Sequence, residues 1–146
     1  MTATYPAPLQ EIIDDFQAVP EADRLELLFE FSEELPEVPE KYAGHEDEME
    51  QVVECQTPLF LAVETGKGED PEVTLVISAP AEAPTTRGFA SVVLQGISGF
   101  KASEILAVPD DMASQLGLTK ALTPLRLRGM SALLGRIKRN ITEQLT

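Results

Sequence analysis

Two short apolar runs in the middle of the chain constrain the fold more than any other feature. The runs are "TPLFLAVETG" and "EVTLVISAP", and the turn-rich stretch "GKGEDP" separates them. This pattern predicts an antiparallel β-hairpin. The upstream stretch "MEQVV" is expected to add a short third strand. Because two strands alone are marginally stable in water, the hairpin must pack against helices.

Two helices are predicted before the hairpin from the spacing of apolar residues. Residues 7–18 form an otherwise acidic helix with one apolar stripe, made of Leu9, Ile12, Ile13 and Phe16. Pro20 opens a second helix, "EADRLELLFEFSEEL", which is expected to end at Pro36. Its stripe consists of Leu25, Leu28, Phe31 and Leu35. Each helix therefore has one face that the rest of the chain must cover.

Helical signals return after Thr85. The stretch "TTRGFASVVLQGIS" is apolar nearly all round, which predicts a buried helix. A short helix is predicted in "KASEILAV" and another in "PDDMASQL". In the latter, Pro109 suits the first helical turn and Gly117 suits a C-terminal cap.

The last predicted helix lies in "LTPLRLRGMSALLGRIKRN". Thr123 can cap its amino end, and Pro124 suits the first helical position. Its apolar stripe consists of Met130, Leu133, Leu134, Ile137 and Ile141. Arg136, Lys138 and Arg139 are expected toward the carboxyl end, where positive charge is favourable to the helix dipole.

The order of these elements predicts the fold class. Helices come first, a small antiparallel sheet follows, helices return, and no βαβ alternation is present. This order indicates an α+β fold with helices packed on one face of the sheet. The length of 146 residues fits a single domain spanning residues 1–146.

The charge is strongly negative and unevenly distributed. The formal net charge is −14; residues 1–72 carry 20 acidic and 3 basic side chains, and residues 73–146 carry 5 and 8. Such a field repels phosphate backbones, so we expect no nucleic-acid partner. The sequence has no run of about 18 apolar residues, so we expect no membrane span. No secretory signal is visible at the start. With one cysteine, an internal disulfide is impossible, and we expect a cytoplasmic protein.

Several kinds of site lack the residues they need. One cysteine and one histidine, His45, cannot furnish a zinc site, and no acidic segment has the spacing of a calcium loop. The glycines do not form a phosphate-binding loop followed by a helix. We therefore expect neither a metal nor a cofactor on this chain.

The remaining candidate is Cys55, and the residues alone leave its role open. It can be an inert thiol packed in the core, or half of a catalytic dyad with His45. It can also be a reactive thiol displayed where a polar connection meets a strand. Glu50 and Glu54 nearby should disfavour the thiolate. A cation could offset them, and Arg126 at the start of the last helix is a candidate.

Two motifs resemble those of the SufE family, the sulfur-acceptor proteins of iron–sulfur cluster assembly. In that family a Gly-Cys-Gln-Ser signature carries the acceptor cysteine, and Cys55 and Gln56 in "ECQTPLFLAVE" match it. A later Leu-Thr-Pro-x-Arg-x-x-Gly signature opens the final helix. Its matches in this chain are Leu122, Thr123, Pro124, Arg126 and Gly129. The stretches "RGFASVVLQGISGFKASEIL" and "RLELLFEFSEELPEVPEKY" also resemble the family, so the similarity covers nearly the whole chain.

The resemblance implies a function in sulfur transfer. A SufS-like, pyridoxal-phosphate-dependent cysteine desulfurase would load a persulfide sulfur onto Cys55, and the protein would deliver that sulfur to a SufBCD-like scaffold complex. The protein would stimulate the desulfurase as an accessory and would not itself be an enzyme. It would need no cofactor, since the pyridoxal phosphate belongs to the desulfurase. A cysteine-dependent enzyme and a structural interaction domain are the alternatives.

The resemblance also assigns roles to individual residues. Cys55 would be the persulfide acceptor, and Arg126 would stabilise the thiolate or persulfide anion. Gln56 and Thr57 would shape the loop. The chain departs from the signature at two positions, where Glu54 replaces the glycine and Thr57 replaces the serine.

Overall fold

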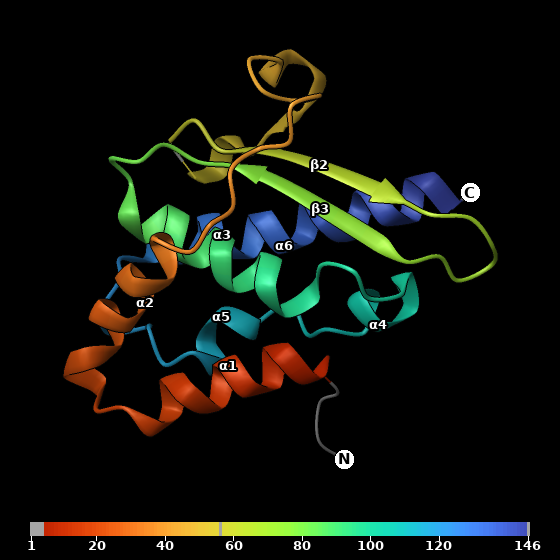
Figure 1. Cartoon of the computed structure of the whole chain (residues 1–146). Helices are drawn as coiled ribbons and strands as arrows, with labels where there is room; N and C mark the ends of the chain where they lie inside the picture. Colours follow the sequence, from red (N-terminus) through yellow and green to blue (C-terminus); the bar gives the residue numbers. More distant parts are fainter. Residues whose placement is uncertain (1–4, 56, 146) are drawn as a thin grey trace.

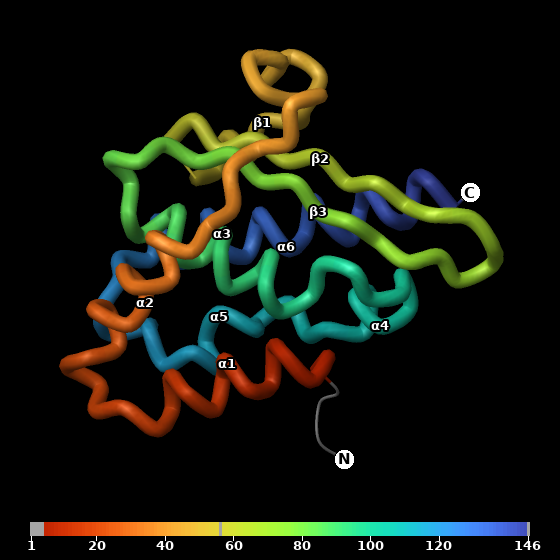
Figure 2. Tube along the Cα trace, in the orientation of Figure 1, coloured from red at the N-terminus to blue at the C-terminus, as the bar shows by residue number. Residues whose placement is uncertain are grey.

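The predicted hairpin forms two strands, β2 (Phe60–Thr65) and β3 (Val73–Ser78), in a computed structural model that describes residues 5–55 and 57–145. They pair antiparallel from Phe60 with Ser78 to Thr65 with Val73. The predicted third strand is β1 (Glu50–Gln51), which pairs antiparallel with β2, so the strand order is β1-β2-β3 (Figures 1 and 2). Alternate side chains of the hairpin therefore point to opposite faces of this sheet.

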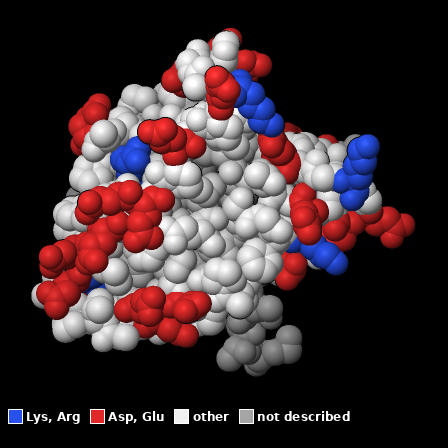
Figure 3. Space-filling view, viewed as in Figure 1, with Lys and Arg blue, Asp and Glu red and all other residues white. Residues whose placement is uncertain are grey.

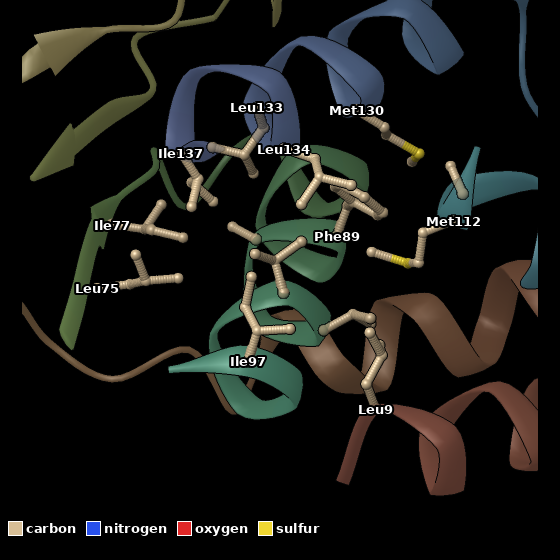
Figure 4. Packing of buried hydrophobic residues seen from close by; sticks show 14 of the residues in the cluster. Leu9, Leu75, Ile77, Phe89, Ile97, Met112, Met130, Leu133, Leu134 and Ile137 are labelled. Atoms are coloured by element: carbon tan, nitrogen blue, oxygen red, sulfur yellow. The ribbon is translucent and has the colours of Figure 1, made fainter. Parts of the chain in front are cut away.

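One face of the sheet packs on the main hydrophobic core. Leu61, Leu75 and Ile77 point to this face and are at most 4% exposed. Helices α3 (Pro84–Ile97) and α6 (Pro124–Leu145) lie beneath it (Figure 1). Figure 4 shows side chains of both helices meeting those of β3 and of the first helix in one continuous cluster. The predicted α+β fold, with helices on one face of the sheet, is confirmed.

The remaining helices pack against α3 or α6. Helices α1 (Ala7–Ala18) and α2 (Arg24–Ser32) pack against it, with the 3-10 turn η1 (Glu21–Asp23) between them. Helices α4 (Ala102–Leu106) and α5 (Met112–Gln115) lead into α6 and contact it. The four residues of the predicted α1 stripe and the five of the α6 stripe are all buried, which confirms both predictions.

The opposite face of the sheet is covered by residues 36–49, which we call the outer segment. It contains the 3-10 turn η2 (Glu46–Glu48) and forms the uppermost part of the molecule in Figure 1. A small second cluster, Met49, Ala62 and Val76, is buried under it. The Tyr42 hydroxyl donates to Glu64 of β2 at 2.7 Å, and the Lys41 ammonium lies 2.5 Å from the same carboxylate. These contacts hold the outer segment on the sheet.

Three boundaries differ from the sequence predictions. Helix α2 ends at Ser32, well before Pro36, because the N–H groups of Glu33 and Glu34 donate to carbonyls three residues earlier and form a tighter turn. Pro109 lies in a turn before α5, since the Met112 N–H donates to its carbonyl at 3.2 Å. Gly117 follows α5 with φ +70°, as expected for a cap. Helix α6 extends to Leu145, which places Arg136 mid-helix and not at the carboxyl end.

Within residues 5–55 and 57–145, no helix is both long enough and apolar enough to cross a membrane.

Candidate functional site

Cys55 is the last residue of the 3-10 turn η3 (Val53–Cys55), which links β1 to β2. Its N–H donates to the Val52 carbonyl at 3.1 Å, and the Val52 N–H donates to the Leu59 carbonyl at 2.9 Å. Val52 and Leu59 are both completely buried. These two anchors hold the turn at the edge of the sheet, where Cys55 is partly buried.

The first two turns of α6 lie directly against Cys55. The thiol donates a hydrogen bond to the Gly129 carbonyl, with the two atoms 3.4 Å apart. A Cβ atom at position 129 would lie 3.1 Å from the Cα of Cys55 and 3.2 Å from the Glu54 carbonyl oxygen. Such distances are tighter than most real contacts, so a glycine at this point allows the helix and the turn to meet. This gives a physical role to the glycine of the second motif.

The sulfur borders a small inner cavity between the turn, α3 and α6. The cavity volume is about 20 Å³. Its lining is largely apolar and comprises Cys55, Leu59, Thr85, Thr86, Phe89, Arg126, Gly129, Met130 and Leu133. A volume of this size accommodates about one water-sized group. Cys55 therefore has space beside its sulfur for one further atom of comparable size.

On its outer side, Cys55 borders a larger hollow that opens to solvent. The hollow has a volume of about 360 Å³ and is lined by Cys55, Thr57, Thr123, Leu125 and Arg126. The Thr123 hydroxyl caps α6 by accepting from the Arg126 N–H at 3.3 Å. Three predicted site residues thus surround one hollow: Cys55, Thr57 and Arg126. Gln56, the fourth, lies outside the described residues.

The predicted neighbours of Cys55 lie near it in different ways. Arg126 is exposed and lines both cavities, but within the described part of the chain no hydrogen bond joins its guanidinium to the sulfur. The Thr57 hydroxyl lies 3.5 Å from the Thr86 hydroxyl, which ties the start of the β2 connection to α3. Arg126 thus lies at the border of both cavities, and Thr57 contacts Thr86 in the wall of the inner cavity.

The surroundings of Cys55 favour the protonated thiol at rest. Burial, reinforced by the charge of Glu54, raises the pKa of Cys55 from 9.0 to about 11, and the charge of Arg136 opposes this shift. The hydrogen bond to Gly129 acts in the same direction as burial, because only a thiol can donate it. In the folded protein, Cys55 is therefore mainly a protonated thiol, which is the less nucleophilic form.

An ion-pair network that sequence reasoning missed lies beside the turn. Glu54 accepts from Arg136 at 3.0 Å, and Glu50 is paired with Arg136 and with Arg139, the latter at 2.7 Å. Asn140 donates to Glu50 at 3.1 Å. Burial alone would raise the pKa of Glu50, but the hydrogen bonds and positive charges of these α6 residues outweigh it and lower the pKa. The cation that opposes the pKa shift of Cys55 is therefore Arg136, which lies on the same helix as the expected Arg126.

A signal for this network does exist in the sequence. Gly129, Leu133, Arg136 and Asn140 recur at intervals of four, three and four residues, which places them on one face of α6. Gly129 and Leu133 border the sulfur's cavity, and the other two bind the acidic residues upstream of Cys55. This face of α6 therefore carries both the inner cavity and the network.

His45 does not contribute to the site. It is exposed, precedes η2 in the outer segment, and its Nδ1 lies 3.5 Å from the Glu48 carboxylate. It lines neither cavity at Cys55. Among the described residues, no three histidine, cysteine or acidic side chains form a cluster that could hold a metal ion. The arrangement around Cys55 thus offers a nucleophile and a space, without a histidine base in contact.

The chain is similar to known proteins along most of its length. The family model SufE, described as an Fe-S metabolism associated domain, matches residues 10–141. An uncharacterised SufE-like protein of Mycobacterium tuberculosis is 54% identical over 142 residues, which cover 97% of this chain and 96% of that protein. The cysteine desulfuration protein SufE of Plasmodium falciparum is 22% identical over 132 residues, 89% of this chain and 52% of that one.

A solved structure has the same fold. The solution structure of a hypothetical protein from Thermus thermophilus superposes with a TM-score of 0.81 at 32% identity, over 97% of this chain and 98% of the other. The likeness therefore extends across the sheet and the helices packed on it.

Proposed function

Since this chain belongs to the SufE family and so has a role in the sulfur metabolism of iron–sulfur clusters, we propose that it carries sulfur on Cys55. A cysteine desulfurase of the SufS type, which bears the pyridoxal phosphate, loads the sulfur as a persulfide. The carrier then delivers it to a scaffold complex of the SufBCD type. Taking the sulfur away frees the desulfurase for another turnover, which is how the carrier stimulates it.

The observation that carries this proposal is the inner cavity beside the Cys55 sulfur. It has room for about one additional atom, and its apolar walls include Leu59, Phe89 and Leu133. A persulfide differs from a thiol by one sulfur atom. Apolar walls beside that outer sulfur would limit its contact with water and reductants between the two partners.

The transfer is an exchange reaction of the thiol–disulfide type. The Cys55 thiolate attacks the outer sulfur of the desulfurase persulfide, and a new S–S bond forms on Cys55. The S–S bond to the desulfurase cysteine breaks, and that cysteine leaves as a thiolate, which takes up the proton released by Cys55. Two electrons stay with the leaving sulfur, so no outside oxidant or reductant is required. The chain itself needs no cofactor for this step.

The neighbouring residues have separate roles in this scheme. Arg126, exposed between the inner cavity and the outer hollow, supplies positive charge to the thiolate or persulfide anion. Thr57 positions the connection between the turn and β2 through its contact with Thr86. We assign the same loop-shaping role to Gln56. The site of action is the cytoplasm, where thiols remain reduced.

The test is a loading reaction read by intact mass. The protein is mixed with a cysteine desulfurase and cysteine, the reaction is quenched without reductant, and the mass is measured. We expect the gain of one sulfur atom, abolished in Cys55→Ser and retained in His45→Ala. Turnover by the protein alone that is lost in His45→Ala would instead support a cysteine-dependent enzyme.

If no cognate desulfurase adds sulfur to the wild-type chain, the carrier function is wrong. Unchanged affinity and activity of Cys55→Ser in every assay would leave a structural interaction domain.

A further inference from the structure

The residue next to the reactive thiol is held by an ion pair of its own. Glu54, which stands where the family signature has glycine, accepts from the Arg136 Nε at 3.0 Å, and the Arg136 Nη2 lies 2.8 Å from the same oxygen. Both nitrogens of the guanidinium fork thus reach one carboxylate oxygen. Because Glu54 and Cys55 belong to the same three-residue turn, a restraint on Glu54 also restrains Cys55.

Arg136 has two features of a structural anchor. Its side chain is only 17% exposed, whereas that of Glu54 is 45% exposed. A largely covered guanidinium needs its partners, since a charge removed from water without a counter-charge is unfavourable. Arg136 also binds Glu50 of β1, so the same side chain joins the strand before the turn to α6. The turn is therefore fastened to α6 by Arg136 in addition to its contact with Gly129.

The Glu54–Arg136 ion pair opposes an outward movement of the turn that carries Cys55. The Cys55 thiol donates to Gly129 and borders the inner cavity, and the backbone of the turn lies against the first turns of α6. A large partner cannot enter a cavity of about 20 Å³. Cys55 also borders the outer hollow of about 360 Å³. An outward shift of the turn would bring the sulfur further into this hollow, where a partner can reach it, and such a shift would separate Glu54 from Arg136.

We propose that Glu54 and Arg136 are positioning residues whose ion pair latches the Val53–Cys55 turn to α6, keeping the sulfur inward until a partner displaces it. The proposal rests on the proposed function for the identity of the reacting thiol and adds a control of its exposure. The two residues also act on the thiol electrostatically, and with opposite sign.

The charges that face Cys55 are few. Glu54 of its own turn disfavours the thiolate, and Arg136 of α6 favours it. Arg126 of α6 lines the cavity, and Glu50 of β1 neutralises part of the Arg136 charge. From α3 the cavity receives Thr85, Thr86 and Phe89, none of which is charged. Substituting either member of the latch therefore frees the turn, while the two substitutions change the acidity of Cys55 in opposite directions.

The test uses Glu54→Gln and Arg136→Gln in the full chain, with two measurements. Hydrogen exchange of the peptide spanning residues 50–59 reports how often the turn opens. The chemical shift of a ¹³Cβ label at the single cysteine reports the fraction of thiolate at about pH 10, close to the range in which thiols titrate.

Both variants should exchange faster, by about threefold, as expected for the loss of a partly exposed ion pair. The closed turn still predominates in both, so the thiolate fraction follows the remaining charge. It should rise in Glu54→Gln and fall in Arg136→Gln. General loosening of the fold would not move the two variants in opposite directions.

Two further variants complete the design. Lys138→Gln removes an α6 cation of similar exposure that binds Val108 and Asp110 away from the turn, and it should change neither measurement. The double variant of Glu54 and Arg136 should exchange no faster than Arg136→Gln alone, because both substitutions break one pair.

Unchanged exchange in both single variants, or equal effects from Lys138→Gln, would overturn the latch. Because these assays contain no desulfurase, they give a result independent of sulfur loading. Failure of the latch would leave the mass test intact, and failure of loading would leave the latch measurable.

Discussion

Gly129 determines how closely α6 approaches the reactive cysteine. The helix and the η3 turn meet with almost no intervening side chain at this residue, and the Gly129 carbonyl accepts from the Cys55 thiol. A contact between backbones is less adaptable than one between side chains, because neither partner can change rotamer to relieve it. A small substitution at position 129 should therefore alter the position or the exposure of the Cys55 sulfur.

Gly129→Ala should destabilise the protein and expose Cys55. The added methyl group would lie about as close as 3.1 Å to the Cα of Cys55, so the turn must move. We expect a loss of about 1–3 kcal/mol in the free energy of unfolding, the usual cost of overpacking. We also expect faster alkylation of the native thiol by iodoacetamide. Urea denaturation and the alkylation rate measure the two effects.

Gly135→Ala is the matched control on the same helix. A Cβ atom at position 135 meets nothing within 4 Å, so the substitution should leave the alkylation rate unchanged. Stability should rise by up to about 1 kcal/mol, because alanine favours the helical conformation over glycine. If both variants alkylate at the wild-type rate, the close contact at Gly129 does not control exposure of the sulfur.

The sequence predicted which residues gather at the site better than it predicted their interactions. Arg126 and Thr57 border the outer hollow of Cys55, and the family resemblance had grouped them. Arg136 was instead interpreted as a helix-terminal charge, because its partner Glu54 lies 82 positions away in the chain. A pairing across that separation depends on how the turn and α6 dock, which local periodicity does not contain.

Helix α3 organises the packing of the other elements. It contacts β3, α1, α2 and α6, and eight of its fourteen residues are buried. The nearly continuous apolar character of residues 85–98 predicted this burial, whereas the end of α2 depended on a turn that the apolar spacing did not reveal. Periodicity thus identified the elements, and side-chain and turn interactions set their boundaries.

Two glycines of α3 should differ in their tolerance of alanine. A Cβ atom at Gly88 would lie 2.3 Å from the Leu28 carbonyl oxygen, which belongs to the backbone of α2. At Gly96 the nearest atom is the Leu9 Cδ1 at 2.9 Å, which a rotamer change can move, and the Leu9 Cβ at 3.0 Å and Cα at 3.3 Å require only a small shift of α1. We expect Gly88→Ala to lower the free energy of unfolding by about 3 kcal/mol or more, and Gly96→Ala by about 1 kcal/mol.

Chemical denaturation of the two variants measures this order. Equal losses would indicate that α2 can move away from α3 as readily as the Leu9 side chain can turn. Since neither glycine lines a cavity at Cys55, sulfur loading of the folded fraction should match that of the wild type in both.

Over the whole molecule, negative charge is separated from the sulfur site. Figure 3 shows acidic side chains gathered over α1 and α2 with few basic ones among them. The exposed acidic residues of these helices are Glu11, Asp14, Asp15, Glu26 and Glu30. In contrast, the acidic residues beside Cys55 are paired with cations of α6. The net charge of −14 therefore comes more from acidic residues on surfaces distant from Cys55 than from those beside it.

The pairing of Glu50 should make the stability of the whole fold depend on acidic pH. The pKa of Glu50 in the folded protein lies below its usual value of 4.5. A carboxyl group with a lowered pKa stabilises the folded state fully above the unfolded value, and this contribution is lost as the pH falls through the folded pKa. Glu50→Gln should therefore unfold more easily than the wild type at about pH 7, by about 1 kcal/mol.

The difference between the two proteins should shrink as the pH is lowered below about 4.5, because the wild-type Glu50 then becomes protonated and loses its attraction to Arg136 and Arg139. Urea denaturation across a pH series measures this convergence. Glu82→Gln serves as the control, since Glu82 is exposed and the described residues provide it with no ion pair. A difference in the free energy of unfolding between wild type and Glu50→Gln that stays constant down to about pH 3 would contradict a charge-based role of Glu50. The shape of the side chain would then be the remaining explanation.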